Sequence, residues 1–164
     1  MASTDPKITL RGIIDTYIVA NPLKIDDGAT NAFTLSLWQS GPERLKYLFF
    51  VANYDLIITF GEFSSRSVRP IQNAPLRYVM SMPVTVTAVD KLDIAGVVVC
   101  TAARMLYKAT YMIRSALEAS ALSGVGATPA FMLKEDSDRG KHVLLAGLDI
   151  WSVEHTIEYI AENP

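Results

Sequence analysis

Residues 62–90 read EFSSRSVRPIQNAPLRYVMSMPVTVTAVD, and this stretch decides the fold. Residues 76–89 end in alternating valine and threonine, which is typical of a strand with one buried face. Residues 56–63 form a matching apolar strand before it. The sequence therefore predicts a long hairpin, with residues 64–75 as its polar connection and Pro83 at a bulge or an edge.

A long amphipathic helix is predicted directly after the hairpin. Asp93 can cap this helix, which would run to about Ser120. A stripe this wide and continuous indicates a helix that lies on a sheet. The apolar stripe consists of Ile94, Val97, Val98, Ala102, Met105, Ala109, Met112, Ile113, Ala116 and Leu117.

The N-terminal part begins with a second, shorter helix. Asp5 can cap it, Pro6 fits its first position, and Pro22 ends it. Alternation of apolar residues with Thr34, Ser36 and Trp38 predicts a strand from Phe33 onward. Residues 43–54 fit either a short helix or a buried strand, and both interpretations stay open.

The C-terminal part is predicted to be a loop followed by strand. Residues 122–142 are turn-rich and polar, with room for a short strand at 131–133. Residues 142–163 alternate irregularly and fit one long strand or two short ones. We therefore expect a single domain, 1–164, of α+β class: a mainly antiparallel sheet with a long hairpin, one long helix packed on the sheet and a short N-terminal helix.

The composition favours self-assembly over membrane insertion. Hydrophobic residues make up 50% of the 164 residues and charged residues only 20%, with a mean hydropathy of +0.23. The most apolar run, residues 94–103, is about half the roughly 20 residues of a membrane-spanning helix. The first residues, MASTDPK, lack the pattern of a signal peptide. We expect a soluble protein, made in the cytoplasm, that buries apolar surface against copies of itself.

The residues with catalytic or ligating chemistry do not form a known motif. His142 and His155 lack a second ligand at metal spacing, and Cys100 is expected to be a small core residue within the long helix. The GVGATP stretch at 124–129 follows a helix, which fits a helix stop better than a phosphate loop. The EDSD stretch at 135–138 lacks the calcium-loop pattern. We predict no catalytic residue, no metal and no cofactor, and therefore no enzyme.

Three arginines give the hairpin its distinctive charge. Arg66, Arg69 and Arg77 lie in a stretch that contains no acidic residue between Glu62 and Asp90. They fit three interpretations: ordinary solvated side chains, a protruding arm that meets acids such as 135–138 on a neighbouring subunit, or a basic rim that faces nucleic acid. The net charge of −2 makes general nucleic-acid affinity unlikely as the main purpose, because such binding needs many cations.

The order of elements resembles that of the tail terminator and head–tail joining (neck) proteins of tailed viruses. The opening DPKITLRGIIDTYI, the unit from MPVTVTAVDK to YMIRSALEAS, and the closing DIWSVEHTIEYI carry this resemblance. It is a likeness of layout over most of the chain, and residues 33–54 are longer and more apolar than the family's minimal layout.

The resemblance implies a structural virion protein. Such a protein forms a hexameric ring that ends the tail tube, joins it to the head connector and lets DNA pass through its lumen without reading sequence. The implied partners are copies of itself, the tail-tube and head-connector proteins. The alternative is a cellular, dimeric ligand-binding or small enzyme domain with an apolar pocket between helix and sheet.

Overall fold

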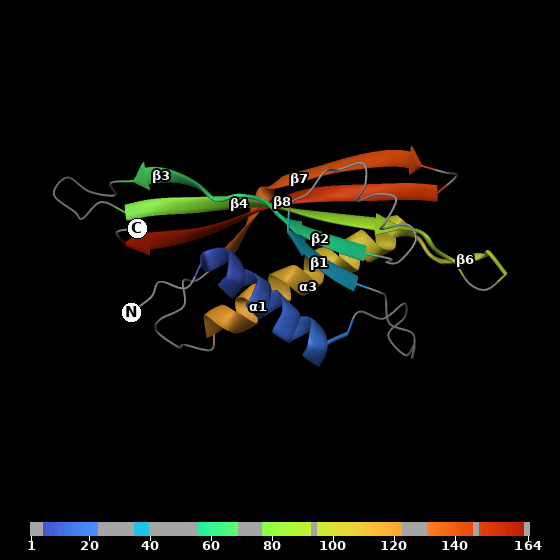
Figure 1. Cartoon of the computed structure of the whole chain (residues 1–164), viewed down its shortest axis with the longest axis horizontal. Coiled ribbons are helices and arrows are strands. Elements are labelled where there is room, and N and C mark those ends of the chain that lie inside the picture. Colours follow the sequence, from blue (N-terminus) through green and yellow to red (C-terminus); the bar gives the residue numbers. More distant parts are fainter. Residues whose placement is uncertain are drawn as a thin grey trace.

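The described residues fold as a curved six-stranded sheet with two helices against one face and a separate two-stranded hairpin (Figure 1). The computed structural model describes residues 5–22, 35–39, 56–68, 77–92, 95–122, 131–145 and 148–162. The helices are α1 (Pro6–Ala20) and α3 (Ala102–Leu122). The strands are β1 (Leu35–Gln39), β2 (Leu56–Phe60), β3 (Ser64–Val68), β4 (Arg77–Val89), β5 (Lys91–Leu92), β6 (Val98–Cys100), β7 (Met132–Leu145) and β8 (Leu148–Glu162). The predicted α+β class, with a long helix on a mainly antiparallel sheet and a short N-terminal helix, is confirmed.

The antiparallel pair β4–β8 is the centre of the sheet. The two strands pair along the whole of β4, from Arg77 opposite Glu162 to Val89 opposite Ile150. The strand order is β1-β2-β4-β8-β7, and β3 also pairs with β4. Only the β1–β2 pair is parallel among the strand pairs that the structure describes. The predicted hairpin is therefore part of a larger sheet.

Pro83 lies where one neighbour of β4 ends and the next begins. β2 pairs with residues 84–88 of β4, and β3 pairs with residues 77–81. Between them the Gly61 N–H donates to the Pro83 carbonyl at 2.8 Å. A side chain at Gly61 would bring its Cβ to 2.6 Å from the Pro83 Cγ, which explains the glycine. The prediction that residues 64–75 are all connection is wrong, because 64–68 form β3.

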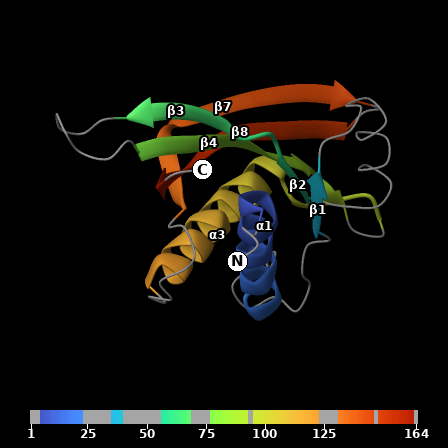
Figure 2. The same ribbon diagram turned by 60° about the vertical axis from the view of Figure 1, so that its left-hand side comes forward.

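The helices pack their apolar stripes onto the sheet. Asp5 caps α1 as predicted, its Oδ1 accepting from the Lys7 N–H at 2.9 Å, and α1 ends before Pro22. Leu10 and Ile14 on α1 are fully buried, as are Met105 and Ile113 on α3. Figure 2 shows the two helices side by side below the sheet. The strand predicted from residue 56 is present as β2, and its Leu56, Ile58 and Phe60 are fully buried in the core.

The start of the long helix differs from the prediction. Residues 91–92 pair with residues 98–100 in the β5–β6 hairpin, and α3 begins only at Ala102. Gly96 has a φ of 78°, which permits the tight reversal, and the β-branched valines that follow favour a strand over a helix. The cap comes from Asp90, whose Oδ1 accepts from the Ala102 N–H at 2.6 Å. Asp93, the predicted cap, lies outside the described residues.

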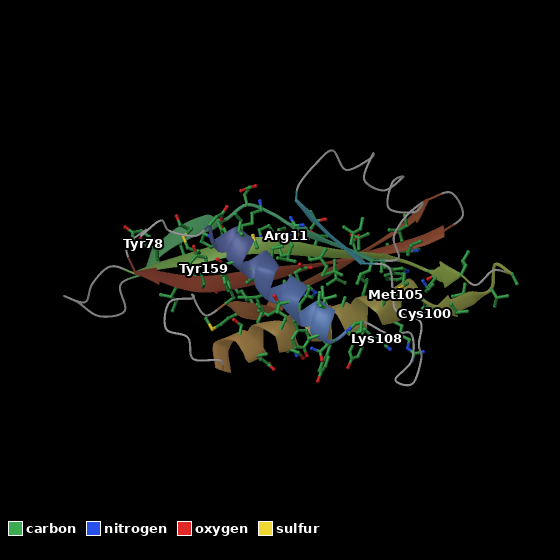
Figure 3. All side chains as sticks on the ribbon, turned by 60° about the horizontal axis from the view of Figure 1, so that its bottom comes forward. Arg11, Tyr78, Cys100, Met105, Lys108 and Tyr159 are labelled. Carbon is green, nitrogen blue, oxygen red and sulfur yellow. The ribbon has the colours of Figure 1, made fainter. Side chains whose placement is uncertain are left out.

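The part of the predicted stripe that preceded residue 102 is therefore not in a helix. Val97 and Val98 are exposed on the β5–β6 hairpin. Cys100 is buried, as expected of a core residue, but it ends β6. Figure 3 places Cys100 beside Met105 at the N-terminal end of α3, with Tyr78 and Tyr159 at the other end of the molecule.

The C-terminal part contains more strand than predicted. Residues 132–145 form β7, so the short strand expected at 131–133 is the start of a much longer one, and the loop expected up to residue 142 is wrong from residue 134 onward. The EDSD stretch lies in β7, where the register with β8 shifts between Lys134 and Arg139. β7 is an edge strand, and charged residues are common there because they discourage further pairing. Residues 43–54 and the GVGATP stretch lie outside the described residues.

Candidate functional site

Two hairpins extend from opposite ends of the molecule (Figure 1). The β3–β4 hairpin carries the predicted arginines. Arg66 lies on β3 opposite Val79, and Arg77 begins β4 opposite Val68. The register thus makes positions 66 and 77 diagonal neighbours on adjacent strands, whereas Arg69 lies outside the described residues. Arg66 was expected in the connection of the hairpin, and the structure places it within β3 instead.

Arg66 belongs to the sheet face opposite the helices. Met80 packs against the core, so its neighbour Val79 and the paired Arg66 have the other orientation. Arg66 is exposed. The same face carries a polar row nearby, in which the Ser81 hydroxyl donates to Glu158 Oε1 at 3.0 Å and the Lys134 ammonium lies 3.8 Å from that oxygen. This end of the sheet can therefore offer an exposed cation to a partner without disturbing the core.

The β5–β6 hairpin has the opposite character. Val97, Val98 and Val99 are 60%, 46% and 41% exposed, and Leu92 is 42% exposed. Four large apolar side chains on one short hairpin form a contiguous apolar segment, which is unusual for a surface that faces only water. One end of the molecule is thus polar with arginines, and the other is apolar.

A groove runs between α3 and β8. Its volume is about 480 Å³. Aromatic rings dominate its surface, since Tyr107 and Tyr111 are 75% and 66% exposed and Trp151 is 36% exposed. Its lining residues are Ala103, Leu106, Tyr107, Thr110, Tyr111, Arg114, Trp151 and Val153. An open aromatic groove with one arginine suits a protein segment or a planar anionic molecule.

Two histidines border this groove. The His142 ring on β7 stacks on Trp151, with ring centroids 4.5 Å apart and an interplanar angle of 27°. His155 on β8 is 1% exposed, and its Nε2 lies 2.9 Å from the Thr110 hydroxyl. Both contacts fix side chains that shape the groove. The prediction that neither histidine belongs to a metal site stays a prediction.

The described residues contain no group of three or more His, Cys, Asp or Glu side chains that could hold a metal ion. Within the same residues, neither helix combines the length and the hydropathy that crossing a membrane requires.

Sequence reasoning missed the aromatic groove. The predicted stripe on the long helix followed the buried residues, and from Ala102 onward all of its members are buried. Tyr107 and Tyr111 lie four residues apart, outside that stripe. Two large aromatic residues at helical spacing on the polar side of an amphipathic helix are the signal that could have indicated this surface.

No protein-family model matches the chain, and no curated protein matches its sequence.

Proposed function

We propose that the protein is a structural virion component, a ring-forming tail terminator or head–tail joining (neck) protein. The observation that carries the proposal is the pair of unlike hairpins at opposite ends of the sheet, one bearing arginines and one apolar. Surfaces that differ in this way suit a head-to-tail contact between copies, and such contacts close into rings. The element order, which resembles the family's layout, supports the same function.

In this proposal the β3–β4 hairpin is an arm that contacts a neighbouring subunit or the adjoining neck protein. Arg66, Arg69 and Arg77 supply charge-assisted hydrogen bonds there, since arginine pairs with carboxylates in a planar, two-pronged geometry. DNA passes through the ring without sequence recognition. The ring has six copies, contacts the tail tube and the head connector, and resides in the virion.

Light scattering coupled to size exclusion, together with negative-stain images of the full chain, tests this function. We expect a concentration-dependent ring of identical subunits. The double variant Arg66→Ala with Arg69→Ala should weaken assembly while the circular dichroism spectrum and thermal midpoint stay unchanged. Arg104→Ala, which removes one exposed arginine from α3, is the control for the loss of a surface charge. Normal assembly of the double variant would leave the arginines as ordinary solvated residues.

The aromatic groove favours a second candidate, a ligand-binding domain with its pocket between helix and sheet. The groove has that location and a size suited to a small molecule. A stable monomer or dimer whose tryptophan fluorescence is quenched by a planar anionic compound, with Trp38 replaced by Phe so that Trp151 alone reports, would support this second function and contradict the ring.

A further inference from the structure

We infer that the outward stripe of α1 in one copy of the chain packs into the aromatic groove between α3 and β8 of the next copy. The outward stripe of α1 is defined as Ile8, Gly12, Asp15 and Val19. This inference rests on the proposed ring, because it gives that ring a specific interface between subunits. The occupant of the groove is therefore a second copy of this chain.

The outward stripe points away from the core of its own subunit. Leu10 and Ile14 are fully buried, and the stripe lies on the opposite side of the helix from them. Ile8 and Val19 are 60% and 78% exposed. Two large aliphatic side chains and one acid at helical spacing thus form an unused face on α1. Because this face points away from α3, it cannot reach the groove of its own subunit.

Packing against the described residues of its own subunit does not explain Gly12. It lies in the interior of α1, where glycine costs roughly 1 kcal/mol relative to alanine. A β-carbon at this position would have nothing within 4 Å among the described residues, so none of them requires its absence. A glycine in an exposed helix interior is explained if the surface of another molecule comes close to the backbone there.

The two surfaces match in spacing. Ile8 and Asp15 are seven residues apart, as are Tyr107 and Arg114 on the groove side of α3. On parallel helices both intervals span roughly 10 Å. Setting Asp15 beside Arg114 then places Ile8 on Tyr107.

The same register places Gly12 opposite Tyr111. The ring of Tyr111 would thus pack against the backbone at Gly12, where no side chain is in the way. Val19 would lie beyond the groove. Side-by-side helices approach to 8–10 Å between axes, and a glycine at the contact favours the shorter distance. Size and charge are therefore complementary at three successive positions, Ile8–Tyr107, Gly12–Tyr111 and Asp15–Arg114.

The surface area that the groove can bury is substantial but smaller than that of a typical stable interface. Aromatic side chains bury roughly 150–250 Å² each, so the exposed parts of Tyr107, Tyr111 and Trp151 offer on the order of 350 Å². A standard interface buries about 800 Å² on each partner. The groove contact would supply about half of this, and the exposed hairpins are the segments that can supply the rest. The contact joins two different surfaces, so it is head-to-tail.

Cysteine cross-linking in the full chain tests the register. The variant Asp15→Cys with Arg114→Cys, oxidised and run on a non-reducing gel, should give a ladder of species up to the ring. Asp15→Cys with Arg104→Cys, which moves the second thiol by roughly 15 Å along the same side of α3, is the matched control and should not. Each single variant controls for Cys100, which is buried.

The outcomes separate this inference from the proposed ring. A ladder supports the head-to-tail contact. Dimers alone would overturn it in favour of a two-fold arrangement. Rings that form without cross-links would overturn the α1–groove contact and leave the ring intact. A chain that stays monomeric at all concentrations would contradict both the α1–groove contact and the ring. The groove would then bind something other than a second copy of the chain.

Charge reversal supplies a second measurement. Asp15→Arg and Arg114→Asp should each weaken association by at least about tenfold, because each sets like charges side by side. Combining them should restore association to within about threefold of the original, as read from sedimentation over a concentration series. Failure of the combined variant to recover, with both single variants folded, would overturn the pairing of Asp15 with Arg114.

Discussion

The two sides of α3 show how one helix can serve two purposes. On the buried side Met105, Ala109 and Ile113 are completely enclosed between the sheet and α1. On the groove side Tyr107 and Tyr111 leave most of their rings in solvent. The fold needs the first set and does not need the second. Large exposed aromatics that add little to folding are best explained by contacts with another molecule.

The largest effect is expected where α1 meets the buried side of α3. Ile14→Ala should lower the free energy of unfolding by about 2–5 kcal/mol, because it leaves a cavity in a fully enclosed part of the core. Urea denaturation of dilute protein measures this. Ile8→Ala, on the exposed side of the same helix, should change stability by less than about 0.5 kcal/mol. Equal effects at both positions would mean that α1 is not docked as described.

A smaller effect is expected at the boundary between the two sides. Thr110→Val removes the hydroxyl that lies 2.9 Å from the Nε2 of the buried His155. Loss of one partner of a buried polar group costs about 1–3 kcal/mol. Thermal and urea unfolding measure the loss, and Thr16→Val on the exposed face of α1 is the control. A Thr110→Val protein as stable as the original would show that this contact does not anchor β8 to α3.

Gly12→Ala should act in opposite directions on folding and on assembly. It should stabilise the isolated subunit by about 0.5–1 kcal/mol, because alanine has the better helix propensity and meets no neighbour. It should also weaken association, because its methyl group would occupy the space of Tyr111 from the next copy. Unfolding of dilute protein and sedimentation at high concentration measure the two effects. A gain in stability with unchanged association would argue against close approach at Gly12.

Tyr111→Ser tests the contribution of the groove side of α3 to assembly, separately from its contribution to folding. The ring is 66% exposed, so its removal should change the stability of the dilute subunit by less than about 0.5 kcal/mol. Assembly should fall by much more, since buried tyrosines are frequent hot spots of interfaces. Sedimentation and urea denaturation of the same preparation give both values. If stability falls as much as assembly, the groove side is part of the core and the contrast between the two sides is lost.

The last prediction concerns the ionisation of the Tyr159 phenol, which affects stability only at alkaline pH. Burial of its ring and, to a lesser degree, the negative charge of Asp5 raise the pKa of Tyr159 above its usual 10.0. The folded state therefore favours the neutral phenol. This contribution to stability is present below the unfolded pKa of about 10 and is lost as the pH rises through the folded value. Unfolding between pH 9 and 11 should show the loss, and Tyr159→Phe should flatten it.

The sequence predicted the elements whose pattern matches their environment. β2 and the second half of β4 alternate because one face of each packs on the helices, and α1 has both a capping aspartate and a following proline. The errors lie where one pattern fits two structures. Apolar residues 94–100 fit a helical stripe and a hairpin equally in spacing, and the valines with Gly96 decide for the hairpin.

The remaining errors arise from contacts distant in sequence. β7 contains charged residues that look like loop, and it becomes a strand only because β8 offers it a partner. The candidate site was predictable only in part. Arg66 and Arg77 lie on paired strands of one hairpin, as the hairpin prediction implied. The groove needs Trp151 from β8 beside Tyr107 from α3, and no local pattern brings these two together.

The interruption at Gly61 and Pro83 divides the sheet into two parts that can change independently. β3 and the first half of β4 lie beyond it, and β2 with the second half of β4 lies on the core side. Adding or removing residue pairs at the outer end of β3, β4 and β8, beyond Met80 and Tyr159, would alter the reach of the β3–β4 hairpin without moving the residues that pack on the core. The length of the β3–β4 hairpin can therefore vary without a change in the core. A related chain could present this hairpin at a different distance from its core by insertions there.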